Sequence, residues 1–112
     1  MVKKLKKKED KISVIIRTKN EARWIGHAIQ SVLDNLYKPE IIIVDNFSTD
    51  ETINIVRQFL QDPNLVDKNN RNYVKIKIFK IEYYTPGKSL NFAVSKCSND
   101  LILLLSAHCV LK

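Results

Sequence analysis

The chain of 112 residues is poor in glycine and cysteine, with two of each, and it has no long apolar run. No Gly-x-Gly-x-x-Gly pattern occurs, so a dinucleotide site of the Rossmann type is not supported. Cys97 and Cys109 fit neither a zinc-site spacing nor a dense disulfide framework, and we expect two reduced cysteines in a cytosolic domain. The apolar run 101–105 is far shorter than the roughly 18 residues of a membrane span, so we predict a buried strand there.

The positive charge is concentrated at the N-terminus. Residues 1–11 contain six lysines against Glu9 and Asp10, so they carry +4 of the formal net charge of +7. We predict a disordered basic tail there, because a stretch with so little apolar surface cannot pack. The alternative is a weak contact of these lysines with an anionic membrane surface. The rest of the chain has charges of mixed sign and no recognisable nucleic-acid motif, so we expect no nucleic-acid partner.

Apolar, β-branched runs alternate with helical patterns along the rest of the chain. We predict strands at 12–17, 40–44, 73–81 and 100–105, helices at 21–36 and 88–96, and a further helix between Ser48 and Asp62. Such an alternation argues for a parallel sheet with right-handed crossovers. The predicted fold is therefore α/β: a Rossmann-like, open, mainly parallel four-stranded sheet in the order 3-2-1-4, with helices on both faces.

Polar residues follow the first two predicted strands. They are Thr18, Lys19, Asn20 and Glu21 after the first, and Asp45, Asn46 and Ser48 after the second. Ligands of doubly wound sheets bind at the carboxyl ends of the strands, where such groups can accept from a pyrimidine N–H or a ribose hydroxyl. The alternative is structural: Asn20 and Ser48 would cap helices, Ser48 in a capping box with Glu51, and Asp45 would close a turn.

Two weaker signals lie further along the chain. Lys88 and Asn91 open a predicted helix after the turn 86–87, and a helix N-terminus beside a lysine suits phosphate oxygens. Ser106 and His108 follow the last strand and are expected to alternate onto one face. A neutral imidazole can bind a divalent cation, whereas a serine is a poor ligand. The alternatives are a solvated lysine and an ordinary hydrogen-bonded histidine.

Four segments in this order resemble family-2 glycosyltransferases with the GT-A fold, along residues 12–111. Residues 13–21 are similar to the family's Ser-Val-Ile-Ile-Pro-Thr-x-Asn-Glu, and residues 43–52 to Val-Val-Asp-Asp-Gly-Ser-Thr-Asp-x-Thr. Residues 87–91 resemble a shortened Gly-Lys-x-x-x-Leu-Asn, and residues 103–108 lie where the family has a strand leading into Asp-x-Asp.

The resemblance implies a site for a nucleotide-activated sugar. The implied nucleotide-binding residues are Thr18, Asn20, Glu21, Asp45, Asn46 and Ser48; Lys88, Asn91 and Ser106 would lie near the diphosphate or the donor sugar, and His108 would be the metal ligand. The donor would be a UDP- or dTDP-linked sugar, the acceptor a glycan or a lipid-linked molecule, and the transfer inverting. Any cofactor would be Mn²⁺ or Mg²⁺.

Three departures from the family pattern affect the predicted site. Asn46 stands where a second aspartate is usual; its amide oxygen can accept from a base N–H but brings no charge. Phe47 replaces a turn glycine. Ser106-Ala107-His108 removes both carboxylates of Asp-x-Asp, so we expect either a lower cation affinity or an activity that does not depend on a metal.

In this family the acceptor site and the catalytic base follow the Asp-x-Asp position. We therefore predict that residues 12–112 are the donor-binding half of a GT-A domain, a truncated unit that contains no catalytic base and does not transfer sugar alone. We expect it in the cytoplasm, or at the inner face of the membrane if the lysine tail binds there. The alternative is a non-catalytic α/β domain that binds a nucleotide or a partner protein. A receiver-like domain is disfavoured because no aspartate ends the third strand.

Overall fold

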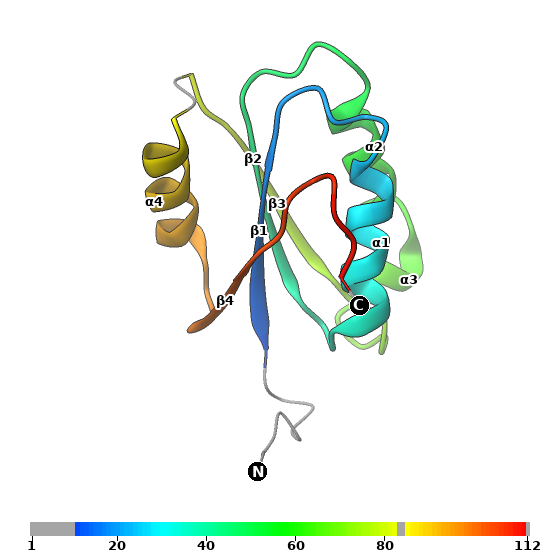
Figure 1. Cartoon of the computed structure of the whole chain (residues 1–112). Coiled ribbons are helices and arrows are strands. Elements are labelled where there is room, and N and C mark those ends of the chain that lie inside the picture. The colour runs from blue at the N-terminus through cyan, green and yellow to red at the C-terminus, as the bar shows by residue number, and fades with distance from the viewer. Residues whose placement is uncertain (1–10, 83–84, 112) are drawn as a thin grey trace.

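Four parallel strands form the centre of the structure, a computed structural model that describes residues 11–82 and 85–111 (Figure 1). The strands are β1 (Ile12–Thr18), β2 (Glu40–Asp45), β3 (Lys75–Lys80) and β4 (Leu101–Leu104). Their order in the sheet is β3-β2-β1-β4, and each neighbouring pair is parallel. The predicted order and direction are therefore confirmed. The predicted basic tail, except for Lys11, lies outside the described residues.

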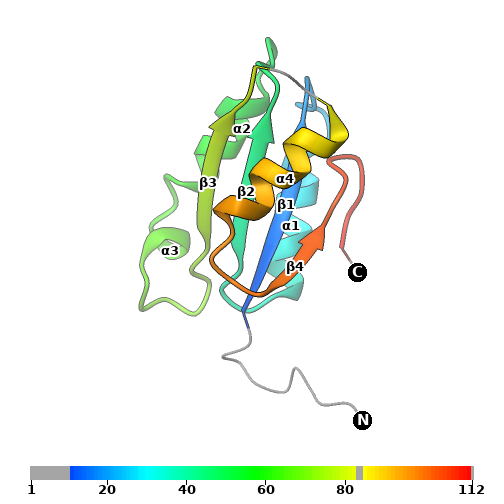
Figure 2. The same cartoon turned by 90° about the vertical axis from the view of Figure 1, so that its left-hand side faces the viewer.

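Helices cover both faces of the sheet, as predicted. They are α1 (Ile25–Asn35), α2 (Thr52–Phe59), α3 (Pro63–Val66) and α4 (Pro86–Lys96). Figures 1 and 2 show α1, α2 and α3 on one face and α4 alone on the other. The sequence patterns did not predict α3, which Asp62 opens by accepting a hydrogen bond from the backbone N–H of Asn64. Among the described residues, none of these helices is long and apolar enough to cross a membrane.

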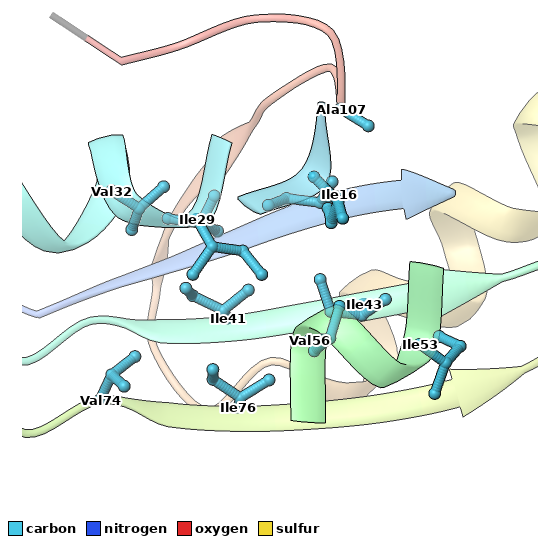
Figure 3. Close-up of a cluster of buried hydrophobic side chains, with 12 residues drawn as sticks. Ile16, Ile29, Val32, Ile41, Ile43, Ile53, Val56, Val74, Ile76 and Ala107 are labelled. Atoms are coloured by element: carbon cyan, nitrogen blue, oxygen red, sulfur yellow. The ribbon is translucent and has the colours of Figure 1, made fainter. Parts of the chain in front are cut away.

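The core consists of two apolar layers, because successive strand side chains point to opposite faces. On the α1 and α2 face, the larger layer includes Val14, Ile16, Ile29, Ile41, Ile43 and Val56 (Figure 3). On the α4 face, Ile15, Ile42 and Val44 pack with Ala93. Every residue of β2 is buried, which is typical of a central parallel strand covered on both sides.

Two predictions about α4 and β4 are wrong, one for the start of the helix and one for the burial of the strand. The helix begins at Pro86 rather than at residue 88, because proline suits the first helical position and Thr85 accepts a hydrogen bond from the backbone N–H of Lys88. The last strand is not buried: Leu101 and Leu104 are 50% and 57% exposed. β4 is the edge of the sheet, and α4 packs on β1 and β2 instead of covering it.

A buried carboxylate at the amino end of β2 ties three strands to the loop before β4. Glu40, only 3% exposed, accepts from Ser13 Oγ at 2.7 Å, from the Ser98 backbone N–H at 2.8 Å and Oγ at 2.9 Å, and from Lys77 Nζ at 2.9 Å. Burial acts to raise the pKa of Glu40, but the hydrogen bonds from Ser98, Ser13 and Lys77 outweigh it and lower that pKa from 4.5 to about 2.

We expect Glu40→Gln to destabilise the fold in a pH-dependent way. A carboxyl whose pKa falls from 4.5 to about 2 on folding contributes up to about 3 kcal/mol at neutral pH. Because the folded pKa is the lower one, this contribution is complete above the unfolded pKa and is lost as the pH falls through the folded pKa. Urea unfolding at several pH values should show that the difference in free energy of unfolding between the unmodified protein and the variant shrinks as the pH falls from 4.5 to 2. A constant deficit, or an equal one for the exposed Glu82→Gln, would contradict the assignment.

The loop after β2 contains a strained residue. Phe47 has a φ of 49°, in the left-handed region that disfavours residues with a Cβ, and its side chain is 48% exposed. This conformation explains why glycine suits the position and phenylalanine does not.

Phe47→Gly should therefore stabilise the protein. Relief of the left-handed strain is worth about 1–2 kcal/mol, and the extra freedom of glycine in the unfolded chain removes about 0.5–1 kcal/mol of it. We expect a net gain of about 0.5–1 kcal/mol in the free energy of unfolding. Phe47→Ala is the matched control, since it removes the ring but keeps the Cβ; a similar gain for both variants would show that the ring, not the backbone, is responsible.

Candidate functional site

The ends of β1 and β2 are joined by a buried carboxylate. Asp45, the last residue of β2, is 0% exposed. Its Oδ1 accepts hydrogen bonds from Thr18 Oγ1 at 2.5 Å and Ser48 Oγ at 2.6 Å, and its Oδ2 accepts one from the backbone N–H of Ser48 at 2.9 Å. Both oxygens of Asp45 are thus engaged by the protein, and Asp45 closes the loop after β2 through Ser48.

Asn20 connects the same two loops a little further out. Its backbone N–H donates to Ser48 Oγ at 2.8 Å, and its Oδ1 accepts from the backbone N–H groups of Thr49 at 2.7 Å and Asp50 at 3.2 Å. The backbone N–H of Glu21 then donates to Thr52 Oγ1 at 2.8 Å. The predicted convergence of the two strand ends is therefore confirmed, and it is held by side chains of each loop bonded to the other.

The prediction that Asn20 and Ser48 cap the helices after them is wrong. α1 begins at Ile25 rather than at residue 21, and the residue before it makes no side-chain capping bond. The residue before α2, Glu51, makes none either. Ser48 and Glu51 match the capping-box spacing, but the Ser48 hydroxyl is bonded to Asp45 and Asn20 instead.

Two residues at these strand ends keep acceptor groups that a ligand could use. The side-chain amide of Asn46 is half-buried, and no other described residue hydrogen-bonds to it. The side chain of Glu21 is 15% exposed, and its Oε1 lies 3.3 Å from Nε2 of His108. The six predicted nucleotide-binding residues therefore divide in two. Bonds across the loops engage Thr18, Asn20, Asp45 and Ser48, whereas the Glu21 carboxylate lies near His108 and the Asn46 side-chain amide is bonded by no other described residue.

A cleft of about 450 Å³ opens beside Glu21, between the ends of β1 and β4 and the start of α4. It is lined by Ile15, Arg17, Glu21, Pro86, Gly87, Leu90 and residues 104–108. The cleft brings together three predicted site residues, Glu21, Ser106 and His108. Ser106 and His108 do not alternate along a strand as predicted, because β4 ends at Leu104 and a turn follows in which Ser106 Oγ accepts from the backbone N–H of His108 at 3.2 Å.

Lys88 and Asn91 are on the exposed surface of α4 and are not among the residues that line the cleft. Gly87 and Leu90, their neighbours in the sequence, line it instead. The predicted phosphate-binding segment therefore does border the cleft, but through the backbone turn at the start of α4.

Arg17 is a cleft residue that the sequence reasoning missed. It lies on the same face of β1 as Ile15, which packs towards α4, because side chains two apart in a strand share a face. The signal was present in the motif comparison, since Arg17 occupies the position where the resembled family has proline. Only the observed cleft shows that this substitution adds a permanent positive charge to the site.

The residues at the Asp-x-Asp position do not fit a resident metal ion. Mn²⁺ and Mg²⁺ favour several oxygen ligands, mainly carboxylates. The cleft offers one carboxylate, Glu21, and one imidazole, His108, while Asp45 is buried with both oxygens bonded. Nowhere in 11–82 or 85–111 do three or more histidine, cysteine, aspartate or glutamate side chains gather in a way that could hold a metal.

Comparison with known proteins gives a family assignment. The sequence profile described as "Glycosyl transferase family 2" matches residues 13–112. An uncharacterized glycosyltransferase of Rickettsia felis is 38% identical over 98 residues, which are 88% of this chain and 29% of that protein. The poly(ribitol-phosphate) β-N-acetylglucosaminyltransferase TarS of Staphylococcus aureus is 26% identical over 102 residues, 87% of this chain and 16% of TarS. The chain thus spans less than a third of these curated relatives.

Solved structures give the same result for the fold. S. aureus TarS 1–349 in complex with UDP matches with a TM-score of 0.70 and 27% identity, over 88% of this chain and 27% of that one. The mannosyltransferase PcManGT from Pyrobaculum calidifontis, solved with GDP-Man and Mn²⁺, matches with a TM-score of 0.69, over 88% of this chain and 28% of that one; at 20% identity it shows the fold alone. The described sheet and helices are those of a GT-A glycosyltransferase domain, and the chain belongs to glycosyl transferase family 2.

Proposed function

We propose that this chain binds the nucleotide-activated sugar donor of a glycosyltransferase and is the donor-binding half of its GT-A domain. The observation that carries the proposal is the joined ends of β1 and β2, where Glu21 lines a cleft of about 450 Å³ and Asn46 follows β2 directly, its side-chain amide bonded by no other described residue. The likeness to S. aureus TarS in complex with UDP, at 27% identity, supports a uridine nucleotide as the first candidate; a dTDP-linked donor is the second.

In this proposal the base and ribose lie over the strand ends. The Asn46 amide oxygen accepts from the N–H of a pyrimidine base, and the Glu21 carboxylate accepts from a ribose hydroxyl. Thr18, Asn20, Asp45 and Ser48 act as positioning residues, since their polar groups are already bonded to one another. The specificity of the site for its nucleotide thus depends on the shape of the two loops. Hydrogen bonds within the protein hold these loops in place.

The sugar and diphosphate lie in the cleft. The start of α4 borders it, and the N-terminus of a helix carries a partial positive charge that favours phosphate. Lys88 in the first turn of α4 adds to this field, and Ser106 contributes a hydroxyl from the opposite side. We propose these as the diphosphate and donor-sugar groups of the site.

The proposed reaction is an inverting transfer. An acceptor hydroxyl on a glycan or a lipid-linked molecule attacks the anomeric carbon, and the bond from that carbon to the diphosphate oxygen breaks with its electron pair on the leaving diphosphate. The hydroxyl proton passes to a base. We place this base and the acceptor site in the part of the relatives' length that this chain does not span. A cytoplasmic location, with the lysine tail at the inner membrane face, would give access to a lipid-linked acceptor.

Amide NMR of the full chain titrated with UDP tests this proposal. We expect shifts at residues 18–21, 45–48 and 105–108. Asn46→Ala should weaken UDP binding about fivefold, since a net hydrogen bond is worth about 1 kcal/mol. Asn72→Ala, an exposed asparagine before β3, is the matched control and should leave binding unchanged. Shifts confined to the lysine tail, or equal losses in both variants, would show that binding is only charge attraction.

A further inference from the structure

Because both carboxylates of the Asp-x-Asp position are missing, other residues determine the charge of the cleft. Glu21 Oε1 and His108 Nε2 lie 3.3 Å apart, so these two groups are placed to interact with each other. Arg17 is the one arginine or lysine among the described residues that line the cleft. An arginine side chain is a cation, so Arg17 brings a positive charge to the site.

The geometry also directs Arg17 towards the place where a diphosphate would lie. The alternation of β1 puts Val14, Ile16 and Thr18 on the α1 face, and Ile15 and Arg17 on the α4 face. Arg17 is the last residue on that face before the chain leaves the sheet, and the start of α4 borders the same cleft. A guanidinium has five N–H donors, so it can hold two phosphate oxygens while other donors bond within the protein.

We propose that Arg17 binds the diphosphate of the donor and supplies the positive charge that a divalent cation supplies in metal-dependent enzymes, so that this chain binds its donor without a metal. The inference rests on the proposed function, because it needs a nucleoside diphosphate in the cleft. Two departures from the family motifs then act together. The proline position of β1 has a positively charged arginine, and the Asp-x-Asp position has lost the carboxylates that would bind a metal ion.

Binding of uridine and of UDP to the full chain, each measured in EDTA and in Mn²⁺, tests the proposal. We expect UDP to bind the unmodified protein in EDTA, with little gain on adding Mn²⁺. Arg17→Gln should weaken UDP binding about ten- to hundredfold, the effect of losing a hydrogen bond between charged groups. It should leave uridine binding unchanged, because uridine has no phosphate. Arg17→Lys should recover part of the loss, since lysine restores the charge but not the two-pronged geometry.

The control for net charge is Arg71→Gln, the same change in the exposed loop before β3, which should leave the binding of both ligands unchanged. Uridine binding by Arg17→Gln also shows that this variant is folded. UDP binding that requires Mn²⁺, or an unchanged ratio of UDP to uridine affinity in Arg17→Gln, would overturn the role of Arg17 and leave the proposed function standing. Failure of the unmodified protein to bind either ligand under both conditions would overturn both.

Discussion

The pairing of β1 with β2 depends on two buried acids, one at each end of β2. Glu40 and Asp45 are the first and last residues of that strand, and each accepts a hydrogen bond from the β1 hydroxyl directly opposite, Ser13 or Thr18. The residues between them are isoleucine and valine, which would pack almost equally well in a neighbouring register. Removing a hydrogen-bond partner from a buried carboxylate is costly, and a slip of one residue would take Ser13 from Glu40 and Thr18 from Asp45. These two pairs therefore define the register on which the site depends.

The register of β1 and β2 also divides the residues of the site into two groups. Some hold the loops together, and others keep groups that a ligand could contact. With Thr18 opposite Asp45, the loops after β1 and β2 run side by side, and Asn20 reaches the backbone of the second loop. Asn20, Asp45 and Ser48, which belong to the family motifs, form hydrogen bonds that join the two loops. Rigid loops of this kind lower the entropy lost when a ligand binds. Outside this network, the Glu21 carboxylate lies against His108, the Asn46 side-chain amide is bonded by no other described residue, and the strained Phe47 is exposed.

The cleft on the α4 face is lined by Arg17, and the residues at its Asp-x-Asp position bring no carboxylate. A metal-binding pair of carboxylates places a small, mobile dication between protein and phosphate. An arginine on a strand that is buried along most of its length gives a charge that is fixed in position and independent of cation supply. In this chain the turn after β4 keeps Ala107 buried and sets His108 against Glu21. The turn itself contains no carboxylate, and Arg17 lines the same cleft.

The sequence by itself determined the class of fold. β-Branched runs and helical periodicity are local properties, and they do not depend on which strands pair or in which register. The order of the strands was predicted with the strand–helix alternation, and the meeting of their ends from the polar residues that follow the first two strands. Only the tertiary structure decided which groups Asn20 and Ser48 bind, since capping spacing looks the same whether or not a loop some 28 residues away offers a better partner. It also decided that α4 leaves β4 exposed and that Arg17 lines the cleft. The burial of a side chain and the groups it contacts depend on which helices and strands lie next to each other in space. These elements are far apart in the sequence.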